Sequence, residues 1–543
     1  MTSDRYAVQY QIGDGAWTNV RVYISYYGET LGSPYRSDSG YTVGSTSMSF
    51  VNIPVTSNTI VRLRVAKVFG TPFQFSDFVS VRPSVKPVSV VPLPDGSVQI
   101  STATGANFGG EQFILWWNRG ADGGGVESLA FFLNPPYTEP TGANVLTVNT
   151  VEDLPDTATL SASAYDTIDF EGMVAIGTTG AVALEIPSNI LNIFFGPDAW
   201  VQGKLRFDLA DMDPGTGVRK TRTIYGPGVL DVSRFNYLNR ACAGTDDEYY
   251  ALSSSTTVAL DHYKLDGIAI LDINHAANNG FFNSSVNNVK VLGWNSENGA
   301  LRLDDNTAVA NVFIRSGDDS LMMWGSPVTI TNATVWQNFN GGVVNLGWDN
   351  NSHDDYDTID GLYVIKTDWQ SPTSTDWTAN PPPGPPAPLQ SQNNAVIASL
   401  MTPGTKFGNT QPPTIRNVFV EDPPQVLFSL KILPPICATN GVFCPPNPNL
   451  AQGSKVHLNI ENLFSPSSSI GNSIGFQNVP AGYVAPGSAA FTSTGDMSIN
   501  MKNVFIKSGF IWLPLLSFDA TGPIGKIGTN GNNVNIVYSV GAP

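Results

Sequence analysis

The stretch NVFIRSG at residues 311–317 recurs almost unchanged as NVFIKSG at residues 503–509. Each copy is a short alternating apolar run that ends in a glycine, and Asn, Gly and Asp flank similar runs over most of the chain after residue 150. These runs are NVKVLG at 288–293, ITNATVW at 330–336, DGLYVIK at 360–366 and RNVFVED at 416–422. Recurrence of one short strand pattern is the signature of a repeat protein.

The spacing of the repeat indicates the kind of repeat protein. Val289, Val312 and Val335 are 23 residues apart, which is about the length of one coil of a parallel β-helix. Residues one coil apart then lie about 4.8 Å apart along the axis, so inward positions form apolar and asparagine ladders and outward positions form a long groove. The competing fold is a β-propeller, but its blades need about 40 residues and a motif per blade that this sequence lacks.

The first 150 residues have a different sequence pattern. Short segments in which apolar and polar residues alternate are separated by Gly, Pro, Asp and Ser, which is typical of an antiparallel β-sandwich. Examples are YAVQYQI, TNVRVYISYY, NTIVRLRVAKV, GSVQIS and EQFILWWN. We therefore predict an all-β protein with a β-sandwich over residues 1–150 and a parallel β-helix over residues 151–543, in which the proline-rich segment 371–394 forms a surface loop.

The charge balance narrows the choice of partner. The chain has 543 residues, of which 13% are charged, and its net charge is -17. A negative long-range field repels nucleic acid, anionic lipid and anionic polysaccharide, so the predicted ligand is a neutral polymer. No segment approaches the roughly 18 consecutive apolar residues of a membrane span. We therefore expect neither nucleic acid nor a membrane as a partner. We also expect the protein to be a monomer.

The cysteines give an indication of the compartment in which the protein works. Cys437 and Cys444 enclose the short loop CATNGVFC, which a disulfide can close, whereas Cys242 has no obvious mate. The alternative is two unpaired thiols. Because disulfides persist in oxidising compartments, the pair predicts a secreted protein. The N-terminus MTSDRYAVQYQ lacks the basic and apolar segments of a signal peptide, so the case for secretion is indirect.

Two adjacent aspartates, Asp318 and Asp319, follow NVFIRSG directly. Asp-Asp occurs four times in the chain, and aspartate favours turns, so the dipeptide alone is uninformative. This pair stands between two strand-like runs, where a turn or bulge at Gly317 is needed to aim both carboxylates into one groove. Two carboxyl groups in one site raise the pKa of one of them, which then donates a proton near neutral pH. Glycoside hydrolysis requires such a pair.

Other chemistries find little support in the sequence. The four histidines show no metal-ligand spacing such as HExxH, and neither GxSxG nor a Ser-His-Asp context occurs. We therefore expect neither a metal nor another cofactor.

Tryptophans gather in the same coils as the aspartate pair. Exposed indole faces stack well on the apolar faces of sugar rings, which makes these residues candidate substrate contacts, with core packing as the alternative for each. They are Trp294, Trp324, Trp336 and Trp348, with Trp369 close by in the sequence.

The central coils resemble a known family. The run from GWNSENGALRL through NVFIRSGDDSLMMWGSPVTITNATVWQNFNGGVVNLGW to DGLYVIKTDW, within residues 293–369, is similar to glycoside hydrolase family 49, the dextranases and isopullulanases. Weaker similarity covers SVRPSVKPVSVV at 80–91, AWVQGKLRF at 199–207 and YGPGVLD at 225–231. The resemblance implies an N-terminal β-sandwich, a right-handed parallel β-helix, and α-glucan hydrolysis with inversion of configuration.

The resemblance also implies roles for single residues. Asp318 matches the family's general acid, and Asp319 matches one of two carboxylates that activate the attacking water. The other lies in a Thr-Asp-Gly turn one coil earlier, where this chain reads SENG and has Asn298. Asparagine orients water but cannot take its proton, so either Asp319 is the sole base, or Glu297 or Asp304 substitutes, or activity is reduced or lost.

Two further departures concern specificity. Met322 and Gln337 stand where the family commonly has lysines, which weakens any transfer of substrate specificity. Two other functions therefore stay open. One is a non-catalytic, carbohydrate-binding β-helix, which the departure at Asn298 motivates, and the other is hydrolysis of another polymer such as a galacturonan, which the acidic charge balance disfavours.

Overall fold

The computed structural model describes the greater part of the chain. The described residues are 3, 5–27, 46–68, 72–73, 79–118, 126–176, 183–210, 212–232, 250–254, 260–271, 275–277, 280–293, 300–338, 341–346, 355–369, 395–401, 406–408, 410–424, 426–432, 455–466, 474–477, 496–508, 511–514, 528–530 and 534–540. Within these ranges the helices are α1 (Thr157–Ala162) and the 3-10 turn Val151–Asp153. In the same ranges no helix is long and apolar enough to cross a bilayer.

Two five-stranded sheets form the N-terminal sandwich. The first contains β2 (Thr18–Val20), β1 (Tyr6–Ile12), β5 (Ile60–Lys67), β8 (Val98–Ala103) and β7 (Ser89–Pro92), in that order. The second contains β3 (Tyr23–Tyr27), β4 (Thr46–Pro54), β10 (Val126–Asn134), β9 (Glu111–Asn118) and β6 (Val79–Arg82). Strand pairs are antiparallel except β4 with β10. Alternate residues of the two sheets, such as Leu63 and Phe131, meet in one apolar core, as the period-two pattern predicts.

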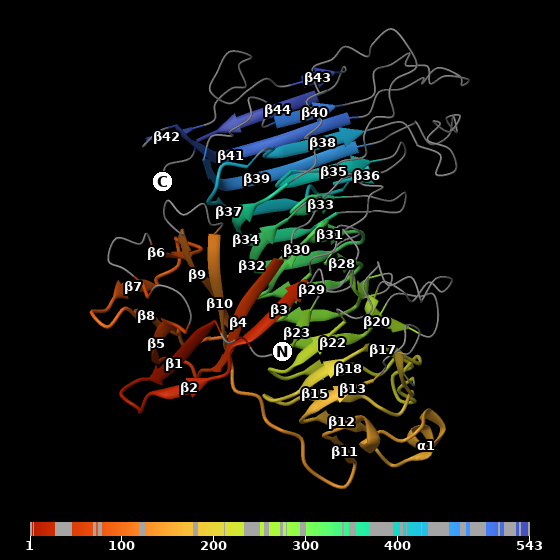
Figure 1. The fold of residues 1–543 in the computed structure, drawn as a ribbon. Coiled ribbons are helices and arrows are strands. Elements are labelled where there is room, and N and C mark those ends of the chain that lie inside the picture. The colour runs from red at the N-terminus through yellow and green to blue at the C-terminus, as the bar shows by residue number, and fades with distance from the viewer. Residues whose placement is uncertain are drawn as a thin grey trace.

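Three sheets of parallel strands form the β-helix that follows (Figure 1). The first has 21 strands: β11 (Val145–Val148), β12 (Thr167–Phe170), β13 (Met173–Ala175), β15 (Asn192–Phe195), β16 (Trp200–Gln202), β18 (Arg222–Tyr225), β19 (Val229–Asp231), β22 (Tyr263–Asp266), β23 (Ala269–Leu271), β26 (Ser285–Asn287), β27 (Lys290–Leu292), β29 (Thr307–Ala310), β30 (Phe313–Ser316), β32 (Val328–Gln337), β34 (Thr358–Thr367), β36 (Lys406–Phe407), β37 (Thr414–Val420), β39 (Lys455–Pro466), β41 (Asp496–Ser508), β42 (Ile511–Pro514) and β44 (Val534–Ser539). Its strands pair in parallel except β41 with β42. It begins at Val145, a few residues before the predicted boundary.

The other two sheets close the coils. The four-stranded sheet contains β14 (Ala183–Ile186), β17 (Lys204–Phe207), β20 (Tyr250–Ser254) and β24 (His275–Ala277). The nine-stranded sheet contains β21 (Leu260–Asp261), β25 (Phe281–Phe282), β28 (Leu301–Leu303), β31 (Leu321–Met323), β33 (Val344–Leu346), β35 (Ile397–Met401), β38 (Phe428–Ile432), β40 (Ile474–Gln477) and β43 (Gly528–Asn530). The predicted all-β fold, a sandwich followed by a parallel β-helix, is therefore confirmed. The proline-rich segment 371–394 lies outside the described residues.

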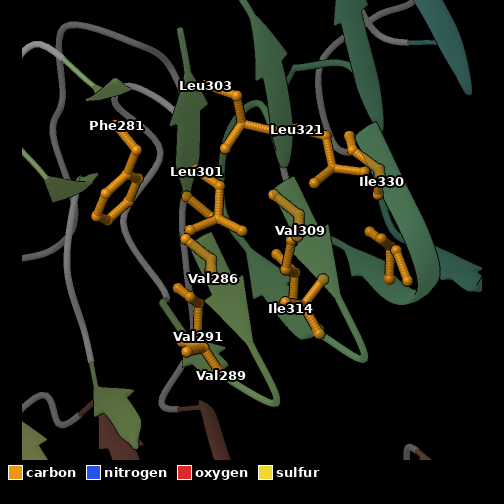
Figure 2. Packing of buried hydrophobic residues seen from close by; sticks show 14 of the residues in the cluster. Phe281, Val286, Val289, Val291, Leu301, Leu303, Val309, Ile314, Leu321 and Ile330 are labelled. Atoms are coloured by element: carbon orange, nitrogen blue, oxygen red, sulfur yellow. The ribbon is translucent and has the colours of Figure 1, made fainter. Parts of the chain in front are cut away.

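The register of the coils corrects one detail of the repeat. Val291 pairs with Ile314, which is 23 residues later, but Ile314 pairs with Val335, which is 21 residues later. Val335 therefore stacks on Ile314 and not on Val312, because the turns between strands differ in length from coil to coil. Figure 2 shows Val291 and Ile314 pointing into the same interior as Leu301 from the nine-stranded sheet.

Asparagine ladders form at the bend of the 21-stranded sheet and not at the predicted inward positions, since these side chains are half-buried and Asn311 Nδ2 also donates to Gly109 O of the sandwich at 3.5 Å. Asn332 Nδ2 donates to Asn311 Oδ1 at 2.7 Å, and Asn503 Nδ2 donates to Asn462 Oδ1 at 3.0 Å. These four asparagines have φ between 53° and 56°, a left-handed conformation that asparagine tolerates better than most residues. The ladder therefore fixes both the bend and the stacking of the coils.

The sandwich packs on the outward face of the strands that follow this bend. An apolar cluster joins Phe50, Trp116 and Phe132 of the sandwich to Phe313 and Trp336 of the β-helix. Figure 1 shows β3, β4 and β10 beside these coils. One outer face of the solenoid is thus covered, so a site on the β-helix must lie on one of its other faces or corners.

Candidate active site

The aspartate pair lies at a corner of the solenoid, between β30 and β31, where the chain passes from the 21-stranded to the nine-stranded sheet. Ser316 Oγ donates to the carbonyl oxygen of Asp318 at 2.6 Å, and Gln337 Nε2 of the next coil donates to the same oxygen at 2.7 Å. Ser320 Oγ in turn donates to Gln337 Oε1 at 2.6 Å. The bend at Gly317 and Asp318 is thus tied to its own strand and to the neighbouring coil.

Asp319 is anchored on both sides along the axis. Its carbonyl oxygen accepts a hydrogen bond from Ala300 N of the preceding coil at 2.7 Å. Its Oδ1 accepts from Gly342 N at 2.6 Å, and its Oδ2 accepts from Asn345 Nδ2 at 2.8 Å, both in the following coil. The side chain is 6% exposed. A carboxylate with both oxygens held by fixed donors is well oriented to bind one ligand atom.

The two carboxylates converge on one point. Asp319 N donates to Asp318 Oδ1 at 2.8 Å, which holds the half-buried Asp318 side chain over its neighbour. A Cβ atom placed on Gly341 would lie 2.4 Å from Asp318 Oδ1 and 2.7 Å from Asp319 Oδ1, so these oxygens are at most about 5 Å apart. The structure thus brings the carboxylates of Asp318 and Asp319 together, and their catalytic role stays a prediction.

Gly341 makes the site possible. It has a φ of 78°, and an added Cβ would lie 2.3 Å from Asp319 N, so a larger residue meets both backbone strain and a collision. Trp369 Nε1 donates to Gly341 O at 2.8 Å and is 4% exposed. Trp369 therefore positions the turn that carries Gly341 and Gly342.

Burial controls the ionisation of the inner carboxyl. Removal from water raises the pKa of Asp319 to about 6. The hydrogen bonds from Gly342 and Asn345 stabilise the ionised carboxylate and lower the pKa, but by less than burial raises it. The side chain is thus ionised at neutral pH and is a stronger base than an ordinary aspartate. Sequence reasoning found the pair but missed Gly341, Gly342 and Asn345, since these residues lie one coil later.

Trp336 does not contact the site, which corrects its prediction as a sugar-binding residue. It is 3% exposed, its ring centroid lies 5.0 Å from that of Trp116, and Arg315 Cζ lies 3.8 Å from its centroid. Its Nε1 donates to Asp368 Oδ2 at 2.9 Å. The indole is enclosed between the sandwich and the β-helix, so no sugar can stack on it.

The remaining predicted residues divide into two groups. Trp324, which follows β31, is half-buried, and Arg302 Cζ lies 3.0 Å from its ring centroid, so one indole face is already occupied. Ala300 precedes β28 and contacts Asp319, whereas Asp304 follows β28. The two ends are roughly 13 Å apart along an extended strand, which separates Asp304 from the pair. The other group lies outside the described residues: Trp294, Glu297, Asn298, Trp348, Cys242, Cys437 and Cys444.

Known proteins share both sequence segments and fold with this chain. A dextranase of Arthrobacter sp. (strain CB-8) is 28% identical over 183 residues, which cover 30% of this chain and 27% of the relative. A dextranase of Talaromyces minioluteus is 24% identical over 209 residues, or 35% of this chain and 32% of the relative. The chain thus spans about a third or less of the length of these relatives. No protein-family profile matches it.

The solved structure of Dex49A from Penicillium minioluteum matches almost the whole chain. The TM-score is 0.68 at 17% sequence identity, and the match covers 99% of this chain and 94% of that one. This chain has the fold of Dex49A. Together with the partial dextranase relatives, this confirms the resemblance that the central coils indicate.

Proposed function

We propose that the protein is a glycoside hydrolase that cleaves a neutral α-glucan, with dextran as the leading substrate. The observation that supports this most directly is the convergence of Asp318 and Asp319 at one point on a coil corner, the inner one with a pKa of about 6. The partial dextranase relatives and the net charge of -17 favour a neutral glucan over an anionic polymer.

The roles of the two side chains follow the family resemblance, in which Asp318 matches the general acid and Asp319 a carboxylate that activates water; burial raises the pKa of Asp319, which makes it a stronger base. Asp318 is the more exposed and donates its proton to the glycosidic oxygen as the bond to the anomeric carbon breaks. Asp319, held by Gly342 and Asn345, accepts a proton from the water that attacks that carbon. Each turnover thus yields one shorter chain with a new reducing end and one with a new non-reducing end. Asn298, where the family has a second base, assists by orienting the water.

The spacing of the pair makes the stereochemistry worth measuring. Acid and base of an inverting glycosidase are usually roughly 6.5–9.5 Å apart, and those of a retaining one about 5–5.5 Å. The Oδ1 atoms here are at most about 5 Å apart, so inversion, which the resemblance implies, requires a water held beside the pair and not between its members. Proton NMR of the first product formed from dextran distinguishes the two outcomes.

A polysaccharide panel tests the proposal. The protein is incubated with dextran, pullulan and polygalacturonate, and products are analysed by mass and linkage. We expect internal cleavage of a neutral glucan and none of the galacturonan. Retarded migration in a dextran gel with no product after long incubation would instead indicate a binding protein. We further propose that the protein is secreted, because such polymers lie outside cells. Recovery of the protein from the culture medium of its source would test this.

A further inference from the structure

A second acidic group lies at the opposite end of the β-helix from the C-terminal coils. Asp169 is on β12, Glu171 follows that strand, and Glu139 belongs to the linker between β10 and β11. One carboxylate oxygen from each of the three residues lies within 4.8 Å of the others. The group is five coils from the Asp318 pair, roughly 24 Å along the axis, and is therefore separate from the proposed active site.

Two oxygens of this group are buried and lack a donor within the described ranges. Asp169 is 1% exposed, and among the described residues no N–H or hydroxyl donor reaches its Oδ1 or Glu171 Oε1, both buried; the two carboxyl groups form a hydrogen bond with each other only when one of them is protonated. The charges that act on Glu171 come from Asp169, Glu139 and Asp198, all of which are acidic. Buried polar groups are normally hydrogen-bonded and buried charges paired, whereas this group has no positive partner within the described part of the chain.

Gly196 of the next coil makes room for the Glu171 carboxyl group, because a Cβ there would lie 2.4 Å from Glu171 Oε1 and 2.6 Å from Glu171 Oε2. We propose that Glu139, Asp169 and Glu171 bind one Ca²⁺ ion, which ties the linker from the sandwich to the first coils of the β-helix.

The three carboxylates favour Ca²⁺ over other metal ions. Ca²⁺ binds oxygen ligands at about 2.3–2.6 Å, so oxygens on opposite sides of one ion are roughly 4.6–5.2 Å apart, and three oxygens within 4.8 Å of one another can reach it together. Zn²⁺ and Cu²⁺ favour nitrogen or sulfur ligands, which the three residues lack, and Mg²⁺ requires a tighter octahedron. Water and backbone carbonyl groups complete the coordination of Ca²⁺ at such sites.

The competing occupant is a proton. Burial and the neighbouring acids raise the pKa of Glu171 to about 7, so Asp169 and Glu171 are able to share one proton near neutral pH. The two occupants respond in opposite ways to neutral substitutions. Loss of a ligand weakens a calcium site, whereas loss of a charge relieves a proton-sharing pair.

Calcium titration of the full chain separates the two. After treatment with EDTA and its removal, the protein is titrated with CaCl₂ at pH 7.5 by calorimetry, and thermal unfolding is followed with CaCl₂, MgCl₂ or EDTA. We expect one Ca²⁺ per chain and a rise in Tm of several degrees with CaCl₂, with a smaller rise for MgCl₂. The variants Glu139→Gln and Glu171→Gln should lose both effects, and Glu152→Gln, at an exposed glutamate nearby, should retain them.

A second variant leaves all three carboxylates in place. Gly196→Ala displaces the Glu171 carboxyl group and should weaken calcium binding at least tenfold. The proposal is overturned if the unmodified chain binds no Ca²⁺ and its Tm is the same with CaCl₂ and EDTA. In that case Glu171→Gln should raise the Tm at pH 7.5, as a proton-sharing pair predicts.

Discussion

Two outer faces of the β-helix contain buried charged groups, and the partners of these groups differ between the two faces. Under the sandwich, Arg315 lies over Trp336, and Lys290 Nζ donates to Asn134 Oδ1 at 2.5 Å and to Gly267 O at 2.8 Å. On the corner beside the nine-stranded sheet, Asp319 has neutral donors, Gly342 N and Asn345 Nδ2, and no cation of the described ranges is among the groups that shift its pKa.

The difference separates a structural face from a chemical one. Burial lowers the pKa of the cations on the covered face, but aromatic rings, carbonyl oxygens and the carboxylates of Asp368, beside Arg315, and Asp266, beside Lys290, compensate in part for the loss of water. The Asp319 carboxylate at the corner is oriented by its donors and has no countercharge among the residues that the structure describes, so burial raises its pKa to about 6. Each of the following changes should therefore affect one face and spare the other.

The largest effect is expected at the aspartate pair. Asp318→Asn and Asp319→Asn should each lower kcat on the best glucan by about 10²- to 10⁴-fold, since each removes a proton-transfer group. Reducing-sugar assays measure this, with Asp14→Asn, at an exposed aspartate of the sandwich, as the control.

The same variants test the buried charge through stability. In the folded chain the pKa of Asp319 is raised, so ionisation costs stability as pH rises from the unfolded pKa of about 3.9 through about 6. Asp319→Asn avoids that cost and should melt no lower than the parent at pH 7.5. A Tm several degrees lower would contradict this account of the site.

The next effect concerns the covered face. Trp336→Ala should lower the free energy of unfolding by about 3–5 kcal/mol, because it leaves a cavity between the sandwich and the β-helix. Urea unfolding measures this, and KM for the glucan should stay unchanged under native conditions. Trp324→Ala is the matched comparison, with a smaller loss of stability. A KM that rises after Trp336→Ala alone would restore the idea that this indole binds sugar.

Gly341→Ala tests the close approach at the corner. The added methyl would collide with Asp319 N and Asp318 Oδ1, so the carboxylates must separate, and misplaced catalytic groups cost on the order of 10² in kcat. Gly105→Ala is the control, since nothing lies within 4 Å of its Cβ position. Full activity of Gly341→Ala would show that the pair does not act through this geometry.

The smallest effect is a shift in pH dependence. Asn345→Leu removes a donor that stabilises ionised Asp319, so the pKa of Asp319 should rise above about 6. A base acts when ionised, and the acidic limb of the kcat/KM profile should therefore move to higher pH. Activity at pH 6 should fall several-fold relative to activity at pH 8. An unchanged profile with lower activity at every pH would point to a purely structural role for Asn345.

The sequence by itself determined the two kinds of fold and the pair at the centre of the site. The alternation in NVFIRSG and its copies specifies strands with one inward face, and their recurrence specifies stacking, because each depends on neighbouring residues alone. Asp318 and Asp319 are adjacent in the chain, so a single bend suffices to bring them together.

The tertiary structure decided what lies across coils and between domains. Val335 stacks on Ile314 and not on Val312, because turn lengths vary and only the folded coil fixes the register. Asn345 and Gly341 reach the aspartates from the next coil, and alternation does not say which residue of that coil arrives there. Trp336 points outward as its strand pattern predicts, but only the docked sandwich shows that this outward face is buried. Such contacts depend on long-range packing, which the local pattern does not encode.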